Sequence, residues 1–253
     1  MAEETTKIDV GGHQLRYRIS GEGDRTIVFL HGFAETIDTW EKLLPELSGI
    51  GRLVVLEQRA HGWSSAPEPP YAWEDLARDV IKALDGLGIA KATLIGHSLG
   101  GIVALLVAKI APERVDELVL IGTTTASTPA QQEWADQVVK SGRMNGIEGL
   151  AHAIWGPMSR EKVEGQPIGM TEVARLLQRL GEEPLTPGLS SIATRTLCLA
   201  GTEDPLWPDA VSAVASALGS AASEGIEGAD HRAHQGRPAE TAAAIRRFLG
   251  VAA

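Results

Sequence analysis

Hydrophobic positions follow two different patterns along this chain, and each pattern predicts a different kind of β-strand. Apolar and polar residues alternate over residues 8–13 and 14–19, around a Gly-Gly pair. Such alternation is typical of an antiparallel pair with one face in water. Residues 26–30 and 53–56 are instead continuously apolar, which predicts strands that are buried on both faces.

Further apolar runs alternate with segments of helical spacing. The runs lie at residues 93–95, 118–122 and 196–200, and a weaker strand is predicted at 222–226. Helical patterns are predicted at residues 38–47, 73–87, from the Ser98 turn to about 110, 208–218 and 238–249. This order predicts an α/β fold with a mostly parallel eight-stranded sheet and helices on both faces.

The alternation stops between residues 125 and 191, where no convincing strand is found. Helical patterns occur instead around residues 129–140, 146–155 and 171–180, the last with Thr171 as N-cap and Gly181 just past its end. A helical insertion of this length in an α/β chain is typical of a lid. We therefore predict a core domain of residues 1–124 and 192–253 with a helical cap at 125–191.

Charge and composition narrow the function classes. The net charge is −10 and the pI is about 5.2, which disfavours nucleic acid or an anionic membrane surface as a partner. No apolar run has the ~18 residues of a membrane span, and the N-terminus lacks a signal-peptide layout. Cys198 is the single cysteine, within an apolar run, so no internal disulfide is expected. A cytoplasmic location is the default expectation.

The stretch Gly96-His97-Ser98-Leu99-Gly100 separates an apolar strand from an apolar helix. It fits the pattern G-x-S-x-G, in which a sharp turn holds a Ser nucleophile in strained geometry and small flanking residues let strand and helix approach. The Ser then lies at a helix N-terminus, where developing negative charge is favoured. The alternative is a Ser in an ordinary Gly-rich turn between strand and helix; the surrounding strand and helix favour a nucleophile.

A Ser hydroxyl needs a base, and the base needs an orienting acid. Only loops at the carboxyl ends of the parallel strands can reach the Ser. The strand that ends at Gly122 is followed by threonines, whereas the strand that ends at Ala200 is followed by Glu203 and Asp204. Either acid is a candidate, and a simple acidic turn ahead of a helix is the alternative.

Two histidines follow the last strand, and either can be the base. They are His231 and His234, in the segment Gly228-Ala229-Asp230-His231-Arg232-Ala233-His234. They are also a possible metal-ligand pair, but no carboxylate or Cys spacing supports a metal, and we expect none. The oxyanion formed by Ser attack needs two donors. We expect the N–H of Leu99, directly after the nucleophile, and the N–H of Phe33, in the loop after the third strand.

Jointly these segments resemble the α/β-hydrolase fold family, in its branch of serine esterases, haloperoxidases and enol-lactonases. The resemblance rests on His31-Gly32-Phe33 with Trp40, Arg59 with Gly62 and Ser64, and residues 96–101, 201–208 and 228–231. It implies a Ser98–Asp204–His231 triad, with Asp204 in the family's Gly-x-x-Asp-x-x-x-Pro form and His231 in its Gly-x-x-His turn.

Two departures from the family pattern concern the pocket floor. Glu57 stands where the family usually has Asp, and Ala60 where it has Gly. Glu57 can still orient the oxyanion loop, although its longer side chain can reshape the floor. Haloalkane dehalogenases and epoxide hydrolases resemble this fold but use an Asp nucleophile, and this chain has Ser98.

The resemblance implies a hydrolase of a small to medium carboxylic ester or lactone, acting through an acyl-enzyme without a cofactor. Alternatives are a cofactor-free perhydrolase or haloperoxidase-type activity, a C–C bond (diketone) hydrolase, and a receptor-like ligand-binding protein that retains the triad. We expect the residues that determine substrate specificity to lie in the cap, although apolar side chains of the cap also suit its own hydrophobic core. The candidate pocket residues are His31, His97, Trp134, Trp155, Met158 and Trp207.

Overall fold

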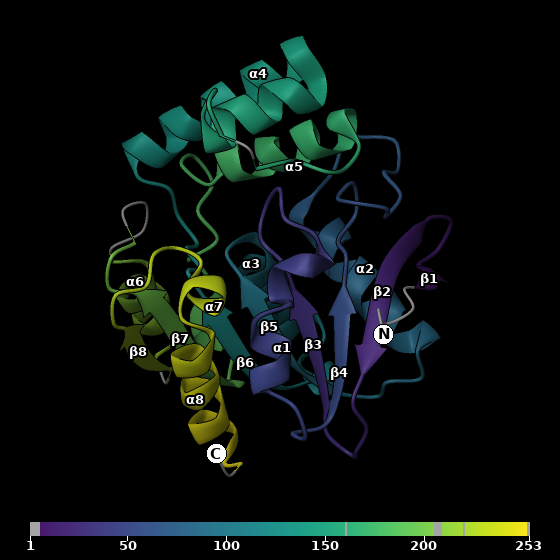
Figure 1. Cartoon of the computed structure of the whole chain (residues 1–253), viewed down its shortest axis with the longest axis vertical. Helices are drawn as coiled ribbons and strands as arrows, with labels where there is room; N and C mark the ends of the chain where they lie inside the picture. The colour runs from purple at the N-terminus through teal and green to yellow at the C-terminus, as the bar shows by residue number, and fades with distance from the viewer. Residues whose placement is uncertain (1–5, 160, 205–208, 220, 252–253) are drawn as a thin grey trace.

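The computed structural model describes residues 6–159, 161–204, 209–219 and 221–251, with the side chains of residues 210 and 211 left out. Eight strands form one sheet in the order β1-β2-β4-β3-β5-β6-β7-β8 (Figure 1). The predicted α/β fold with an eight-stranded sheet is therefore confirmed. The strands are β1 (Thr6–Asp9), β2 (Gln14–Ser20), β3 (Thr26–Leu30), β4 (Arg52–Leu56), β5 (Ala92–His97), β6 (Val115–Ile121), β7 (Arg195–Gly201) and β8 (Ala222–Ile226).

Strand direction follows the two hydrophobic patterns. The alternating strands β1 and β2 pair antiparallel, and β2 pairs antiparallel with β4. All pairs from β4 to β8 are parallel. The turn between β1 and β2 needs its glycines because Gly11 and Gly12 have φ of 93° and 102°.

Helices cover both faces of the sheet, which explains the continuous apolar runs. On β3, Val28 and Leu30 belong to the core under α2, α3 and α6, whereas Ile27 and Phe29 belong to the core under α1 and α8. These helices are α1 (Leu43–Glu46), α2 (Trp73–Gly86), α3 (Leu99–Ile110), α6 (Ala210–Leu218) and α8 (Pro238–Leu249).

One predicted helix is broken in the structure. The segment 38–47 forms a 3-10 turn, η1 (Ile37–Trp40), and the short α1. Pro45 has no N–H to continue a helical ladder from η1, which explains the break. Two further 3-10 turns, η2 (Pro112–Arg114) and η3 (Leu189–Ser191), and the short α7 (Ala233–Gly236) were not predicted.

Helices α4 (Pro129–Trp155) and α5 (Pro167–Arg179) form a layer of their own beyond one end of the sheet (Figure 1). Two of the predicted helical patterns are the halves of α4, which changes direction at Gly146 (φ 58°). The predicted N-cap at Thr171 is wrong: α5 begins at Pro167, and the Thr171 hydroxyl donates to the Pro167 carbonyl at 2.7 Å. Gly181 does follow the helix end, one residue after the C-cap.

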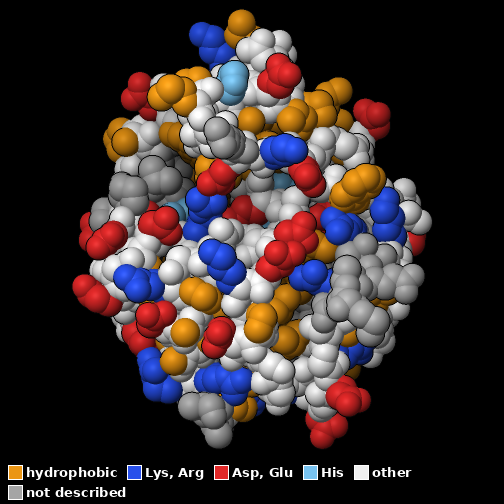
Figure 2. Space-filling model, viewed as in Figure 1, with side chains coloured by type: hydrophobic (Ala, Val, Ile, Leu, Met, Phe, Trp, Pro, Cys, Tyr) orange, Lys and Arg blue, Asp and Glu red, His pale blue; other side chains and the backbone are white. Residues whose placement is uncertain are grey.

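The surface differs between this layer and the core. Hydrophobic side chains gather on the upper part of the molecule, and acidic and basic side chains mix over the rest of the visible face (Figure 2). Exposed Met144, Met158 and Ile168 belong to the α4–α5 segment. Among the described residues, no helix combines the length and hydrophobicity that a membrane span requires.

Candidate active site

Ser98 lies on a strained turn between β5 and α3. Its φ is 50° and its ψ is −113°, a conformation that is unusual for a residue with a Cβ. The glycines around it are required sterically, as predicted. A Cβ on Gly96 would lie 2.5 Å from the carbonyl carbon of Gly100, and a Cβ on Gly100 would lie 2.5 Å from that of Leu30.

The β7 loop (residues 201–204) and the β8 loop (residues 227–232) bring one acid and one histidine together. The Nδ1 of His231 lies 2.7 Å from Oδ2 of Asp204, whose carboxylate is buried. The Glu203 N–H donates to the Ala229 carbonyl at 2.9 Å, which ties the two loops, while Glu203 itself is exposed. Of the two acids that the sequence left open, Asp204 is therefore the one in contact with a histidine.

Burial lowers the pKa of the His231 imidazole, and the charge of nearby His97 acts in the same direction. The hydrogen bond to Asp204 opposes this shift. The ring is therefore held as a neutral base at neutral pH, with Nδ1 directed to the carboxylate.

His234 lies in α7 and is not among the residues that line the cavity described below. It is fully buried, its Nε2 lies 2.9 Å from the Thr39 hydroxyl, and its ring packs 4.6 Å from that of Trp40. Burial lowers its pKa well below the ordinary value. His234 thus packs α7 against η1.

The loop after β3 (residues 31–36, the β3 loop) runs beside the Ser98 turn. His31 is fully buried, where its Nε2 accepts the Gln58 N–H at 3.0 Å, so it packs beneath the cavity instead of lining it as expected. Burial lowers its pKa to about 4. Phe33, the next expected contributor, does line the cavity.

A buried carboxylate in the β3 loop was not predicted. Glu35 Oε2 accepts the Gly32 N–H at 2.7 Å and lies 2.9 Å from Nδ1 of His97. The sequence carries only a faint signal for it, an acid four residues after His31 in an otherwise apolar turn. Its partner is 62 positions away along the chain.

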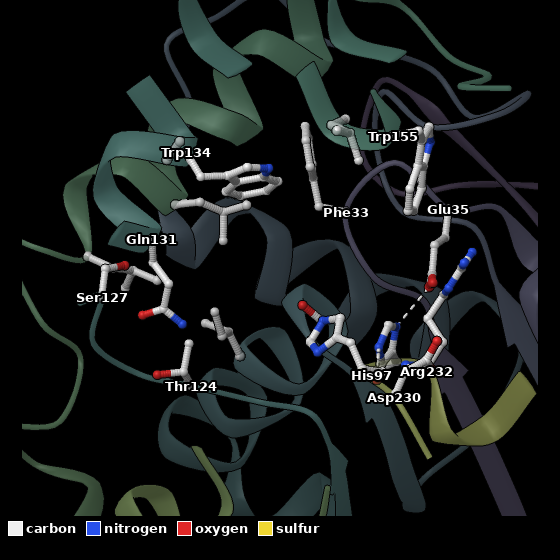
Figure 3. Close-up of a pocket in the computed structure, with 17 residues that line it drawn as sticks. Phe33, Glu35, His97, Thr124, Ser127, Gln131, Trp134, Trp155, Asp230 and Arg232 are labelled. Atoms are coloured by element: carbon white, nitrogen blue, oxygen red, sulfur yellow. Dashed lines mark hydrogen bonds and ion pairs between the residues drawn. The ribbon is translucent and has the colours of Figure 1, made fainter. Parts of the chain in front are cut away.

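A cavity of about 230 Å³ lies between the Ser98 turn and the α4–α5 layer. Ser98, His97 and His231 line one part of its wall. Figure 3 shows Thr124, Ser127 and Gln131 on one side, His97, Glu35, Asp230 and Arg232 on the other, and Phe33 and Trp134 between them. The apolar wall includes Phe33, Ile102, Trp134, Ile154, Trp155 and Leu177.

The six expected pocket residues thus have different outcomes. His97, Trp134 and Trp155 line the cavity. His31 does not, and Met158 is 95% exposed on the surface after α4, so neither contacts it. Trp207 lies outside the described residues, as do Pro205 and Pro208 of the family motif.

Glu57 and Ala60, the two departures from the family pattern, lie below the cavity. Glu57 is fully buried and accepts the N–H of Trp63 at 2.7 Å and of Ile37 at 3.4 Å, so it supports η1 instead of lining the pocket floor. Burial raises its pKa. Ala60 has φ of 68°, a left-handed conformation for which glycine is better suited.

One cluster of potential metal ligands occurs among the described residues. It comprises Glu35, His97 and His234, whose ligand atoms lie within 4.8 Å of one another. It differs from the His231–His234 pair considered from the sequence. Its closest pair, Glu35 and His97, is in direct hydrogen-bond contact, so we interpret the cluster as a proton-holding network.

Comparisons with known proteins agree with this fold. A family model described as alpha/beta hydrolase fold matches residues 25–144. An enol-lactonase structure from Burkholderia xenovorans LB400 aligns over 97% of this chain and 100% of its own, with 26% identity and a TM-score of 0.86. The chain has the α/β-hydrolase fold, and its sequence resembles that family over the matched residues.

The curated relatives that resemble this chain differ in the activities that their names give. The 3-oxoadipate enol-lactonase 2 of Acinetobacter baylyi is 27% identical over 208 residues, with 76% of each protein covered. A dihydrolipoyllysine-residue acetyltransferase component of the acetoin cleaving system from Pseudomonas putida is 34% identical over 143 residues, which span 56% of this chain and 39% of that protein. The enol-lactonase matches support a hydrolase role in general, without a particular substrate.

Proposed function

We propose that this chain is a serine hydrolase that cleaves a small to medium carboxylic ester or lactone. Ser98 is the nucleophile, His231 the base and Asp204 the acid that orients the base. The carrying observation is that the strained Ser98 shares one cavity with His231, and His231 Nδ1 is 2.7 Å from Asp204 Oδ2.

The three residues have different roles in the proposed reaction. Ser98 Oγ attacks the carbonyl carbon while His231 takes the hydroxyl proton at Nε2, and Asp204 accepts the hydrogen bond from Nδ1. His231 returns the proton to the departing alkoxide oxygen, which leaves an ester on Ser98. Water then attacks this ester, with His231 again taking and returning the proton, and releases the acid.

The proposed oxyanion donors are the N–H groups of Leu99 and Phe33. Leu99 is the first residue of α3, and N–H groups in a first helical turn have no partner within the helix. The helix dipole adds favourable potential there. Phe33 belongs to the β3 loop, whose backbone is fixed by the Glu35 contact with Gly32.

We further propose that residues 125–191 act as the cap that selects the substrate. The cavity volume of about 230 Å³ is below the ~300–1,000 Å³ of sites for drug-sized ligands, which favours a small acyl or lactone group. Trp134 and Trp155 of α4 contribute apolar wall. Thr124, Ser127 and Gln131 give one side of the cavity uncharged polar side chains, which suit a neutral polar substituent on the substrate.

Charges on the cavity wall favour a substrate without its own negative charge. Glu35 and Asp230 bring carboxyl groups to the wall. Arg232 is the one Arg or Lys among the described wall residues, and Glu161 holds its guanidinium through contacts of 2.9 and 3.0 Å. An added carboxylate on the substrate would therefore meet repulsion from these carboxylates, because Arg232 is already paired with Glu161 and His97 with Glu35.

Covalent labelling tests the nucleophile. A fluorophosphonate should add its phosphonyl group to Ser98 in the wild type, and Ser98→Ala should abolish both labelling and the product burst from a p-nitrophenyl ester. Ser127→Ala is the matched control, because Ser127 lines the same cavity and should keep the label. Labelling of Ser98→Ala, or no burst in the wild type, contradicts the proposal; the second result favours a ligand-binding protein.

Paired substrates test the charge preference and paired variants test the base. Activity on p-nitrophenyl butyrate should exceed that on p-nitrophenyl hemisuccinate, whose acyl chain is equally long, by at least about tenfold. This is roughly the free energy of one unfavourable contact between like charges near the protein surface. His231→Ala should abolish acylation, whereas His234→Ala should retain the label. Equal rates on both esters, or the reverse order of the variants, overturns the respective assignment.

A further inference from the structure

Glu35 and His97 form a buried pair beside Ser98 that the proposed reaction does not use. Glu35 Oε2 and His97 Nδ1 are 2.9 Å apart, and the two side chains are only 7% and 2% exposed. Both residues line the cavity together with Ser98, and Figure 3 shows their contact on the side of Asp230 and Arg232. A buried carboxylate at such a place needs a partner, and His97 provides it.

The pair connects three segments that the proposed reaction requires. Glu35 Oε2 also accepts the Gly32 N–H at 2.7 Å, which fixes the β3 loop. His97 directly precedes Ser98, and its Nε2 lies 3.1 Å from the carbonyl oxygen of His231 in the β8 loop. A single run of hydrogen bonds thus links the β3 loop, the Ser98 turn and the β8 loop.

Counting protons along this run fixes the charge of His97. A carbonyl oxygen only accepts, so His97 Nε2 carries a hydrogen and donates to His231. A neutral imidazole has one N–H, and Nδ1 would then need to accept from a protonated Glu35. The Gly32 N–H already donates to the same Glu35 oxygen, which stabilises the carboxylate form.

The surrounding charges agree with an ionised pair. Burial alone would raise the pKa of the Glu35 carboxyl, but the charge of His97 and its hydrogen bond hold that pKa well below the usual range. The groups that face His97 are Glu35, His31, His231, His234 and Arg232. Burial lowers the pKa of the His31, His231 and His234 rings, so these neighbours stay neutral beside the pair.

We propose that ionised Glu35 and doubly protonated His97 are a positioning pair that locks the β3 loop and the β8 loop onto the Ser98 turn. The inference rests on the proposed function for its catalytic consequence. With the pair intact, the Phe33 N–H and the His231 ring keep their places relative to Ser98. The positive ring beside His231, 4.9 Å between centroids, also disfavours a proton on the base.

Glu35→Gln should break this arrangement without changing the volume of the side chain. One amide cannot accept the Gly32 N–H and the His97 Nδ1–H at one oxygen and leave its NH₂ group satisfied in a buried place. His97 then becomes neutral, with its remaining hydrogen on Nε2. We expect kcat to fall by roughly 100-fold, the effect of about 1 Å of misplacement, with KM changed less than threefold. The acid limb of the pH profile should move to higher pH, since His231 loses a positive neighbour.

Nitrogen NMR of ¹⁵N-histidine protein tests the pair directly. In the wild type, both ring nitrogens of His97, assigned by the loss of its signals in His97→Gln, should be protonated from pH 6 to pH 8, whereas Glu35→Gln should show one. Asp38→Asn is the matched control, because Asp38 is an exposed acid three residues after Glu35. This substitution should change neither the spectrum nor kcat. A singly protonated His97 in the wild type overturns the proposal even if Glu35→Gln does not fold.

Activity and labelling separate this inference from the proposed function. If fluorophosphonate does not label Ser98 although His97 is doubly protonated, the serine mechanism fails while the ion pair stands. If Ser98 is labelled but Glu35→Gln keeps the wild-type kcat and pH profile, the positioning role is wrong and the serine mechanism is retained.

Discussion

Replacement of Gly100 by Ala should separate the Ser98 turn from the sheet. The added Cβ would lie 2.5 Å from the carbonyl carbon of Leu30 and 2.7 Å from the carbonyl oxygen of His31. Favourable contacts between non-bonded atoms begin near ~3.5 Å, so the start of α3 must move by about 1 Å. Both neighbours are backbone atoms of β3 and its loop and cannot rotate away.

The displacement should affect stability and rate together. Overpacking of this kind costs about 1–3 kcal/mol of unfolding free energy, which urea unfolding measures. Ser98 precedes α3 and moves with it, and a shift of about 1 Å costs roughly 100-fold in rate, which kcat/KM on p-nitrophenyl butyrate measures. Gly236→Ala is the control, since its Cβ meets one atom, Asp230 Oδ1, at 3.8 Å. A Gly100→Ala protein with wild-type stability and activity within threefold would refute the steric reasoning.

Three further predictions concern buried ionisable side chains. Asp79→Asn should lower the unfolding free energy by about 3–5 kcal/mol, because it leaves Arg59 without the carboxylate that holds it at 2.7 and 2.8 Å; a loss below 1 kcal/mol in urea contradicts this. Burial lowers the pKa of His31 to about 4 and of His61 to about 3, so the unfolded chain binds more protons below the ordinary value of 6.5. The unfolding free energy should therefore fall as pH drops from 6.5 towards 4, by on the order of 3 kcal/mol for His31 alone. Urea unfolding at several pH values measures this, and an unfolding free energy that does not change with pH would contradict the idea that these rings are neutral in the folded protein. Since burial also lowers the pKa of His231, kcat/KM should stay near its plateau at pH 6.5 and decline only in more acidic buffer; a midpoint above 7 argues against His231 as the base.

The sheet is the part of the fold that local sequence pattern predicts best. Residues 26–30 are apolar at every position because Val28 and Leu30 face one helical layer while Ile27 and Phe29 face the other. That requirement acts on each residue separately, so it is visible without tertiary information. The break between η1 and α1 and the kink at Gly146 were less visible, because a helical hydrophobic period continues across both.

The α/β fold and the Ser98 turn were predictable from the sequence, because the buried strands are apolar at every position and the turn needs a small residue at Gly96 beside a residue with positive φ. The sequence narrowed the acid to two neighbours and the base to two histidines. The residues alone left both choices open, and the folded chain shows that Asp204 contacts His231 and that His234 packs on η1. The same holds for Glu35 and His97, because a contact across 62 residues depends on how two loops are brought together and leaves no local period.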